Sequence, residues 1–279
     1  MSGITPSQEK RARDVREALI AVMSEIPDKE IAVGLSAGVD SFSVMCAALE
    51  AGKSVTAYSF TVDGWASRDW TMARRNAKAV GVPFRSVLIM KDQDQMLKDL
   101  AHLASIGCVR KTQFECCWCM MKVTDAVAER TLAIGVGCDS YFCLSKKAMI
   151  HMRHSVELMD QHRTRSTQTS AKERAILNAH AETLGKVVET PLQHQRFREI
   201  LFGTTWEELN RPQEKLPLHM AFPEYRSKVR IYPHTNFQCG DSKIQPMFES
   251  LLEHPLVKPH GFKSPIALYN AIRKGVIKP

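Results

Sequence analysis

Residues 36–41, with the sequence SAGVDS, join a short apolar run to a helical pattern and contain the side chains that a phosphate site needs. A turn at the start of a helix directs several backbone N–H groups and the positive end of the helix dipole at one point. Gly38 lets a ligand approach the backbone closely, while Ser36 and Ser41 can donate hydroxyl hydrogen bonds. Asp40 can cap the helix or position Mg²⁺. The segment therefore predicts a phosphate or pyrophosphate site, the alternative being an ordinary capped turn.

The eight cysteines are a second set of side chains that could bind a metal or take part in a reaction. Cys116 and Cys119 form a C-x-x-C motif, a spacing typical of metal sites and redox pairs. A zinc site of this type needs further ligands, for which Cys108 and His234 are candidates. The alternative is that the cysteines are reduced structural thiols, because free cysteines are often buried.

Alternating apolar patterns place residues 36–41 between a strand and a helix. Short apolar runs predict strands at 31–35, 55–62, 84–90 and 133–137. Helical periodicity predicts helices at 42–51, 70–80, 93–103, 122–132 and 171–184. This alternation predicts an α/β fold with a doubly wound, mostly parallel sheet. In such a sheet, ligands bind beyond the carboxyl ends of the strands, where residues 36–41 and 138–139 fall.

The pattern Ser-x-Gly-x-Asp-Ser after the first predicted strand resembles the pyrophosphate loop of the PP-loop ATP pyrophosphatases, the adenine nucleotide alpha hydrolase-like superfamily. That superfamily includes tRNA thiolases, adenylylsulfate (APS and PAPS) reductases and DNA phosphorothioation proteins. Its usual pattern is Ser-Gly-Gly-x-Asp-Ser, and Ala37 replaces the first glycine here. The resemblance extends from about Ile31 to Asp139, because residues 135–139 are similar to the superfamily's fourth-strand Gly-x-x-x-Asp. Ser140 stands where a second acid is usual.

The resemblance implies that ATP is cleaved between its α and β phosphates, so that AMP activates the substrate and pyrophosphate leaves. It also implies that Asp40 is catalytic and that ATP and Mg²⁺ are bound by one set of residues at the strand ends, namely Ser36, Ala37, Gly38, Val39, Asp40, Ser41, Asp63 and Asp139.

The cysteines add to this resemblance. Cys116, Cys119 and the later Cys239 are similar to the three-cysteine site of iron-sulfur-dependent tRNA thiolases, in which one iron is left open to carry sulfur. This implies an iron-sulfur cluster, or alternatively Zn²⁺, held by these three residues. Adenylylsulfate reductases are also similar around the adjacent cysteines, but their second C-x-x-C and their C-terminal Glu-Cys-Gly-Leu-His are missing here. Cys119 and Cys138 are candidate catalytic thiols, since Cys138 flanks the predicted nucleotide pocket.

Closely spaced prolines set the last part of the chain apart. From residue 201 onward they interrupt the pattern so often that long elements are not expected. Together with the resemblance, this predicts a PP-loop ATP pyrophosphatase domain at residues 1–200. It also predicts a smaller, irregular, Pro-rich accessory or substrate-binding region with a basic tail at residues 201–279.

The net charge of +8 favours an anionic partner, either nucleic acid or a phosphorylated small molecule. Residues 146–174 contain seven basic and three acidic residues, and residues 257–279 contain five basic and none acidic. These stretches are either a surface that follows phosphates or ordinary solvated surface. The polar run at 165–170 predicts a mobile loop. No run reaches the roughly 18–20 apolar residues that span a bilayer, and we expect a cytoplasmic protein without a membrane partner.

Three functions remain open at this point. The leading interpretation is an ATP pyrophosphatase that adenylylates a tRNA base or the DNA backbone for sulfur insertion, with a cysteine desulfurase or another protein as sulfur donor. The second is a ligase or synthase that acts on a small carboxylate or amide, or an APS or PAPS reductase-like enzyme. The third is a non-enzymatic protein that binds ATP and has lost turnover.

Overall fold

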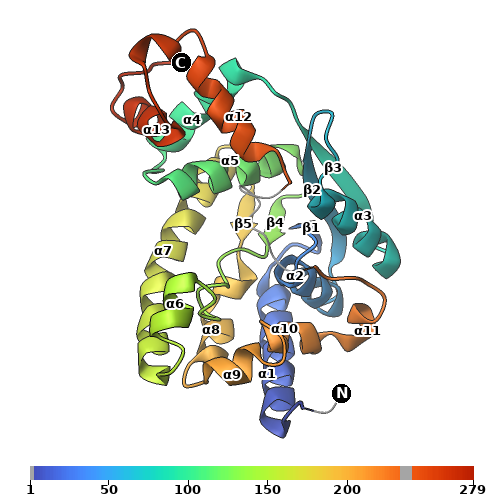
Figure 1. Ribbon diagram of the computed structural model, residues 1–279. Coiled ribbons are helices and arrows are strands. Elements are labelled where there is room, and N and C mark those ends of the chain that lie inside the picture. Colours follow the sequence, from blue (N-terminus) through green and yellow to red (C-terminus); the bar gives the residue numbers. More distant parts are fainter. Residues whose placement is uncertain (1–2, 233–240) are drawn as a thin grey trace.

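A computed structural model describes residues 3–232 and 241–279, apart from the side chain of Ser170. Its centre is a five-stranded sheet in the order β3-β2-β1-β4-β5, and all of its strand pairs are parallel. The strands are β1 (Glu30–Gly34), β2 (Ser54–Val62), β3 (Phe84–Ile89), β4 (Thr131–Ile134) and β5 (Val187–Glu189). Helices cover both faces of the sheet (Figure 1). The predicted doubly wound α/β fold is confirmed.

The helices fall into two layers because successive strand side chains point to opposite faces. Ala32, Leu132 and Val188 pack on one side with α4 (Gln93–Ser105), α5 (Lys111–Ala126), α7 (Val156–Glu182), α12 (Ile244–Ser250) and α13 (Pro265–Arg273). Ile31 and Ala133 pack on the other side with α1 (Pro6–Glu25), α2 (Val39–Glu50), α3 (Arg68–Val80), α8 (Gln195–Leu201) and α10 (Leu216–Ala221).

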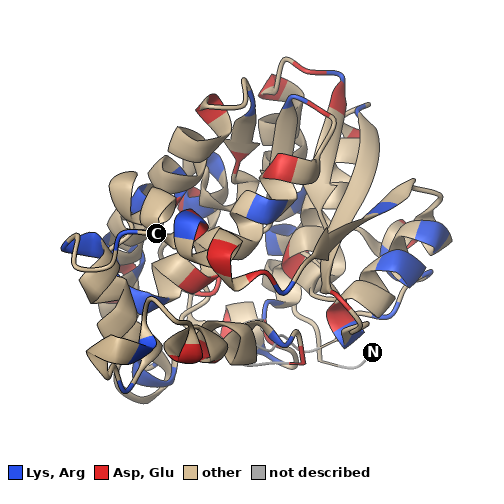
Figure 2. Cartoon of the chain, turned by 90° about the horizontal axis from the view of Figure 1, so that it is seen from above, with Lys and Arg blue, Asp and Glu red and all other residues tan. Residues whose placement is uncertain are grey.

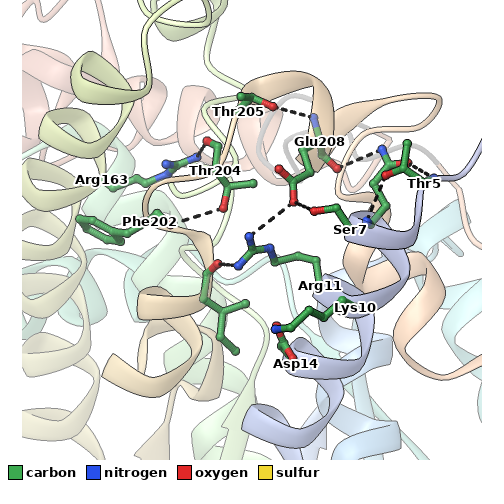
Figure 3. A network of polar contacts seen from close by, with 12 residues as sticks. Thr5, Ser7, Lys10, Arg11, Asp14, Arg163, Phe202, Thr204, Thr205 and Glu208 are labelled. Carbon is green, nitrogen blue, oxygen red and sulfur yellow. Dashed lines mark hydrogen bonds and ion pairs between the residues drawn. The ribbon is translucent and has the colours of Figure 1, made fainter.

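Short elements complete the chain. They are α6 (Lys146–His151), α9 (Trp206–Asn210), α11 (Pro223–Arg226) and the 3-10 turns η1 (Pro191–Gln193), η2 (Leu251–Glu253) and η3 (Lys258–His260). The start of α1 is fixed to α9 by a polar network, in which Glu208 accepts hydrogen bonds from Ser7 (2.7 Å) and Arg11 (3.4 Å) (Figure 3). No described helix is both long and apolar enough to cross a bilayer.

Two sequence-based boundaries around the fourth strand are wrong. The helix predicted at 122–132 is α5, which begins at Lys111 and ends at Ala126, where Val127 turns into an extended conformation. The strand predicted at 133–137 is β4, whose Thr131 to Ile134 pair with Ile31 to Gly34 of β1. Residues 135–137 belong to the loop that follows, because Gly135 packs on the backbone of Ser41 and Gly137 has a positive φ of 85°.

The polar run at 165–170 is not a loop, because it lies inside the 27-residue helix α7. Hydroxyl groups in this helix donate hydrogen bonds to the backbone carbonyl four residues earlier, so they do not need water as a partner. Thr164 donates to Asp160 (2.9 Å) and Thr167 donates to Arg163 (3.1 Å). Burial of Arg163 and Ser166 then holds the polar turns against the protein. Tertiary contacts here outweigh the weak helix preference of Ser and Thr.

Residues after 200 pack on both faces of the sheet. Leu218 and Phe222 join the core on the side of α1 and α2, whereas Phe248 and Tyr269 join the core on the opposite side. An aromatic cluster fixes the latter group to α5, with ring centroids 5.3 Å apart for Trp118 and Phe248 and 4.8 Å apart for Phe114 and Tyr269. Such pairs each add about 0.5–1.5 kcal/mol beyond the burial of their area.

Candidate functional site

The loop at residues 36–38 leaves the carboxyl end of β1 and enters α2, and its own serines hold its shape. The Ser36 N–H donates to Ser41 Oγ (2.9 Å), the two hydroxyl oxygens lie 3.0 Å apart, and the Gly38 N–H donates to Ser36 Oγ (3.1 Å). Gly38 is the N-cap of α2 and makes no side-chain capping hydrogen bond. The first N–H groups of a helix lack intrahelical partners, so this end can bind an anion.

The loop lies at the point where the order of the strands reverses. β1 pairs with β2 on one side and with β4 on the other, and the segments that follow β1 and β4 meet there. A Cβ atom on Gly135 would lie 2.5 Å from the Ser41 nitrogen and 2.7 Å from the Asp40 carbonyl carbon. Only glycine lets the two segments approach this closely. Open α/β sheets bind ligands in the crevice at such a reversal.

Three charged side chains meet beside the loop. The Lys215 ammonium donates to Asp40 Oδ2 (2.6 Å) and also forms an ion pair with Asp139 Oδ1. The Lys215 side chain is 5% exposed, that of Asp40 14% and that of Asp139 46%. The group is therefore buried on the lysine side and open to solvent on the Asp139 side, so a ligand can reach it from there.

The electrostatics of the group keep Lys215 charged. Burial by itself lowers the pKa of Lys215, but its neighbours Cys138, Asp40 and Asp139 together outweigh burial and raise it. Burial, with Asp40 adding to it, raises the pKa of the adjacent Cys138 thiol well above its usual range. The site thus holds an ammonium ion, two carboxylates and a neutral thiol.

Lys215 reaches the loop because of an unusual backbone arrangement before α10. It is the N-cap of that helix and has a left-handed φ of 55°. Its N–H donates to Asn210 Oδ1 (3.1 Å), and the Asn210 amide in turn donates to the Phe142 carbonyl (3.0 Å). No motif in the sequence marks Lys215, which lies 175 residues after Asp40. The sequence prediction missed it for this reason.

The donor atoms at this site fit Mg²⁺ in part. Carboxylate oxygens suit Mg²⁺, which usually binds one or two carboxylates together with substrate phosphates. Asp40 Oδ1 is buried without a hydrogen-bond partner, and Asp40, Cys138 and Asp139 have ligand atoms within 4.8 Å of one another. A thiol does not suit Mg²⁺, so Asp40 and Asp139 are the residues that would hold it.

Comparison of the sequence with models of known protein families and with curated proteins found no match. Fold and site geometry therefore carry the functional argument for this chain.

The structure brings together most of the residues predicted to bind nucleotide, but not all of them. Ser36, Ala37 and Gly38 form the loop, Asp40 and Ser41 lie in the first turn of α2, and Asp139 lies beside Asp40. The Val39 side chain points into the core instead of toward a ligand.

Asp63 follows β2 as predicted, but its side chain is exposed and it is not a member of the group that contains Asp40. A different acid contacts the loop. The Asp69 carboxylate, on the first turn of α3, accepts a hydrogen bond from the Ala37 N–H (3.3 Å). The sequence prediction did not include Asp69.

The C-x-x-C motif lies in the middle of α5. Cys119 is fully buried, and burial, followed by the neighbouring Cys116, raises the pKa of its thiol well above the usual range. Among the described residues, neither Cys116 nor Cys119 belongs to a three-ligand group. Cys239 and His234 lie outside the described residues. The predicted three-cysteine metal site therefore remains a prediction.

The basic stretch at 146–174 is divided between surface and interior. Arg163 is fully buried, donates to the Tyr141 carbonyl (2.9 Å) and pairs with Asp160 (2.5 Å). It also donates to the Thr204 carbonyl (3.4 Å; Figure 3). It fixes α7 to the segment that follows β4, so it is not available to bind phosphates. Other basic residues of this stretch, including Lys146, Lys147 and Arg153, are exposed.

Proposed function

We propose that this chain is an ATP pyrophosphatase that adenylylates a group on a nucleic acid and releases pyrophosphate, so that sulfur can be inserted. One observation carries the proposal. An uncapped helix N-terminus, two carboxylates and a buried ammonium meet at the point where the order of a parallel sheet reverses. This combination offers both the anion site and the charges that a nucleoside triphosphate requires.

The residues have separate tasks in this reaction. A substrate oxygen attacks the α phosphorus of ATP, and the bond to the bridging oxygen of pyrophosphate breaks. The N–H groups at the start of α2 and the Lys215 ammonium stabilise the negative charge that develops on pyrophosphate. Asp40 and Asp139 orient Lys215 and would hold Mg²⁺, which supplies further positive charge to the phosphates when it is bound. A sulfur nucleophile then displaces AMP together with the activated oxygen.

The burial of the cysteines favours sulfur from another protein. The thiolate is the nucleophilic form of cysteine, and burial keeps Cys119 and Cys138 as thiols. A cysteine desulfurase or a similar sulfur donor is therefore the proposed partner. An iron-sulfur cluster on Cys116, Cys119 and Cys239 is the alternative source.

The same burial supports a second candidate function. A ligase or synthase that joins an amine to an adenylylated carboxylate or amide needs no reactive thiol. It would use the same loop, carboxylates and lysine, with a nitrogen nucleophile in place of sulfur. The two functions share ATP cleavage and differ in the second step.

Product analysis of ATP labelled at its α phosphate tests the proposal. With Mg²⁺ and an RNA or DNA acceptor, we expect labelled AMP or adenylylated acceptor together with pyrophosphate. Formation of ADP and phosphate would reject cleavage at the α phosphate, and ATP binding without turnover would favour the non-enzymatic alternative. Iron and sulfide content after anaerobic purification, with mass spectrometry of nucleic acids from cells lacking the protein, would separate sulfur insertion from the ligase reaction.

Replacement of Gly135 by alanine should displace the loop. The new Cβ would meet the backbone of Ser41 and Asp40, which cannot turn away as a side chain can. We expect the affinity for ATP, measured by calorimetry, to fall at least about tenfold, with a loss of about 1–3 kcal/mol in the free energy of unfolding. Gly34→Ala is the matched control, because its Cβ would meet the Ile134 side chain at 3.0 Å. Equal ATP affinities for both variants would contradict the proposed role of Gly135.

A further inference from the structure

Helix α3 and the segment at 226–232 form one basic edge of the molecule. The Asn76 amide donates to the Arg230 carbonyl (3.3 Å), which joins the two pieces. Residues 68–78 and 226–232 contain a single acid, Asp69. They also contain seven basic residues, namely Arg68, Arg74, Arg75, Lys78, Arg226, Lys228 and Arg230. In Figure 2, blue segments lie along the helix at the right-hand edge, where Figure 1 places α3.

Four of these basic residues lack a carboxylate partner in the part of the chain that the structure describes. Arg74, Arg75, Lys78 and Arg230 are exposed, and among the described residues none of them forms an ion pair with a carboxylate. The Asp69 carboxylate accepts a hydrogen bond from the Ala37 N–H of the loop. An unpaired row of exposed cations attracts an anionic partner.

Aromatic rings lie among these cations. The Arg68 guanidinium lies 4.1 Å and the Arg230 guanidinium 5.0 Å from the centre of the Tyr232 ring. The Arg74 guanidinium lies 5.7 Å from the Trp70 ring. Flat guanidinium groups and aromatic rings are the surfaces on which unpaired bases stack. The basic residues from 68 to 78 extend along the helix for about 15 Å, which exceeds the length of a single nucleotide.

This edge begins at the loop itself. The Tyr232 N–H donates to the Ala37 carbonyl (3.1 Å), so the stacking surface continues directly into residues 36–41. A chain bound along α3 would therefore lead to the site where the proposed function places ATP.

We infer that the α3 edge, defined by Arg68, Trp70, Arg74, Arg75, Lys78, Arg230 and Tyr232, binds a single-stranded segment of nucleic acid and presents it to the loop. Its place in the reaction rests on the proposed function, whereas the binding itself does not. Unpaired nucleotides offer both phosphates for the cations and bases for the rings. A duplex hides its base faces, and a small phosphorylated molecule would not fill the edge.

Fluorescence anisotropy with a 5′-fluorescein-labelled 15-nucleotide strand of mixed sequence, as RNA and as DNA, tests the inference over a series of KCl concentrations. For the variant R74A/R75A/K78A we expect an affinity at least tenfold weaker than that of the unchanged protein. The slope of log K against log salt should decrease by about 2, because each lost contact to a single strand removes about 0.7. The matched control is K146A/K147A/R153A, which removes the same charge from exposed positions in and near α6.

Equal losses in the two triple variants, or a loss in the control alone, would overturn the inference and assign binding to general charge or to the α6 surface. Tyr232→Leu should weaken binding about tenfold with an unchanged salt slope, because stacking and not charge is lost. The same strand annealed to its complement is a further probe. If this duplex binds as tightly as the single strand, the inference is also overturned. The RNA and DNA arms show which strand is preferred. Failure of ATP cleavage in the unchanged protein, with strand binding still dependent on α3, would reject the proposed function and leave this inference standing.

Discussion

Replacement of Asp40 with asparagine is expected to lower the rate of pyrophosphate release from ATP by at least about 100-fold, the loss typical of removing one group that stabilises charge in a transition state. Asn keeps the shape of the side chain but removes the charge that holds the Lys215 ammonium at 2.6 Å. It also replaces one of the two carboxylate oxygens with an amide nitrogen, which does not bind Mg²⁺. A coupled phosphate assay with pyrophosphatase measures the rate.

The fold of the Asp40→Asn variant should remain intact, because Lys215 keeps Asp139 as an ion-pair partner. Circular dichroism and thermal unfolding check this point. Asp14→Asn is the matched control, since it removes the same charge from α1, where Asp14 pairs with the exposed Lys10. A rate for Asp40→Asn within threefold of the unchanged protein would reject the assignment of this loop to ATP cleavage.

Replacement of Lys215 with methionine is expected to have the second large effect, on both activity and stability. Removal of one partner from a buried ion pair leaves uncompensated charge and typically costs about 3–5 kcal/mol, and the half-exposed Asp139 places this case near the lower limit. Under the proposed function, pyrophosphate release should also fall at least about 100-fold, because the ammonium that would stabilise the charge on pyrophosphate is lost. Urea unfolding and the same coupled assay measure the two effects.

A double variant separates the two effects of Lys215. Lys215→Met combined with Asp40→Asn removes the cation and the more buried of its two carboxylates, so part of the lost stability should return while activity stays absent. Lys243→Met controls for the backbone, because Lys243 also has a left-handed φ, 65°, at the start of a helix but is exposed. We expect that control to change the free energy of unfolding by about 1 kcal/mol or less. A destabilisation equal to that of Lys215→Met would show that the ion pairs contribute nothing.

Local signals in the amino-acid sequence predict the central strands and the place of the loop. Residues 31–35 are apolar and uninterrupted, and a turn of small residues followed by a helical pattern comes directly after them. These are local signals, since the period of the side chains and the first turn of a helix depend on neighbours only a few residues away. The same locality explains why the first three strands agree with their predicted ranges within one residue at each end.

Local patterns failed where burial of distant residues decides the conformation. The polar run at 165–170 has no apolar periodicity, but it is helical because Arg163 and Ser166 are buried and hydroxyl groups bond to the preceding turn. Arginine is a common phosphate ligand, but Arg163 is held inside the protein by two distant carbonyl groups, of Tyr141 and Thr204, and by the Asp160 carboxylate of its own helix. A charge in a sequence does not reveal whether it is exposed.

The set of residues that forms the site depends on how the helices pack. Lys215 joins Asp40 and Asp139 because α10 packs on α1 and α2, and because a left-handed backbone at its N-cap turns the side chain toward the loop. Asp69 and Tyr232 reach Ala37 from α3 and from the segment before residue 233. These contacts join residues between 32 and 195 positions apart in the sequence. Packing of whole helices brings such residues together, and no periodic pattern within one segment contains that information.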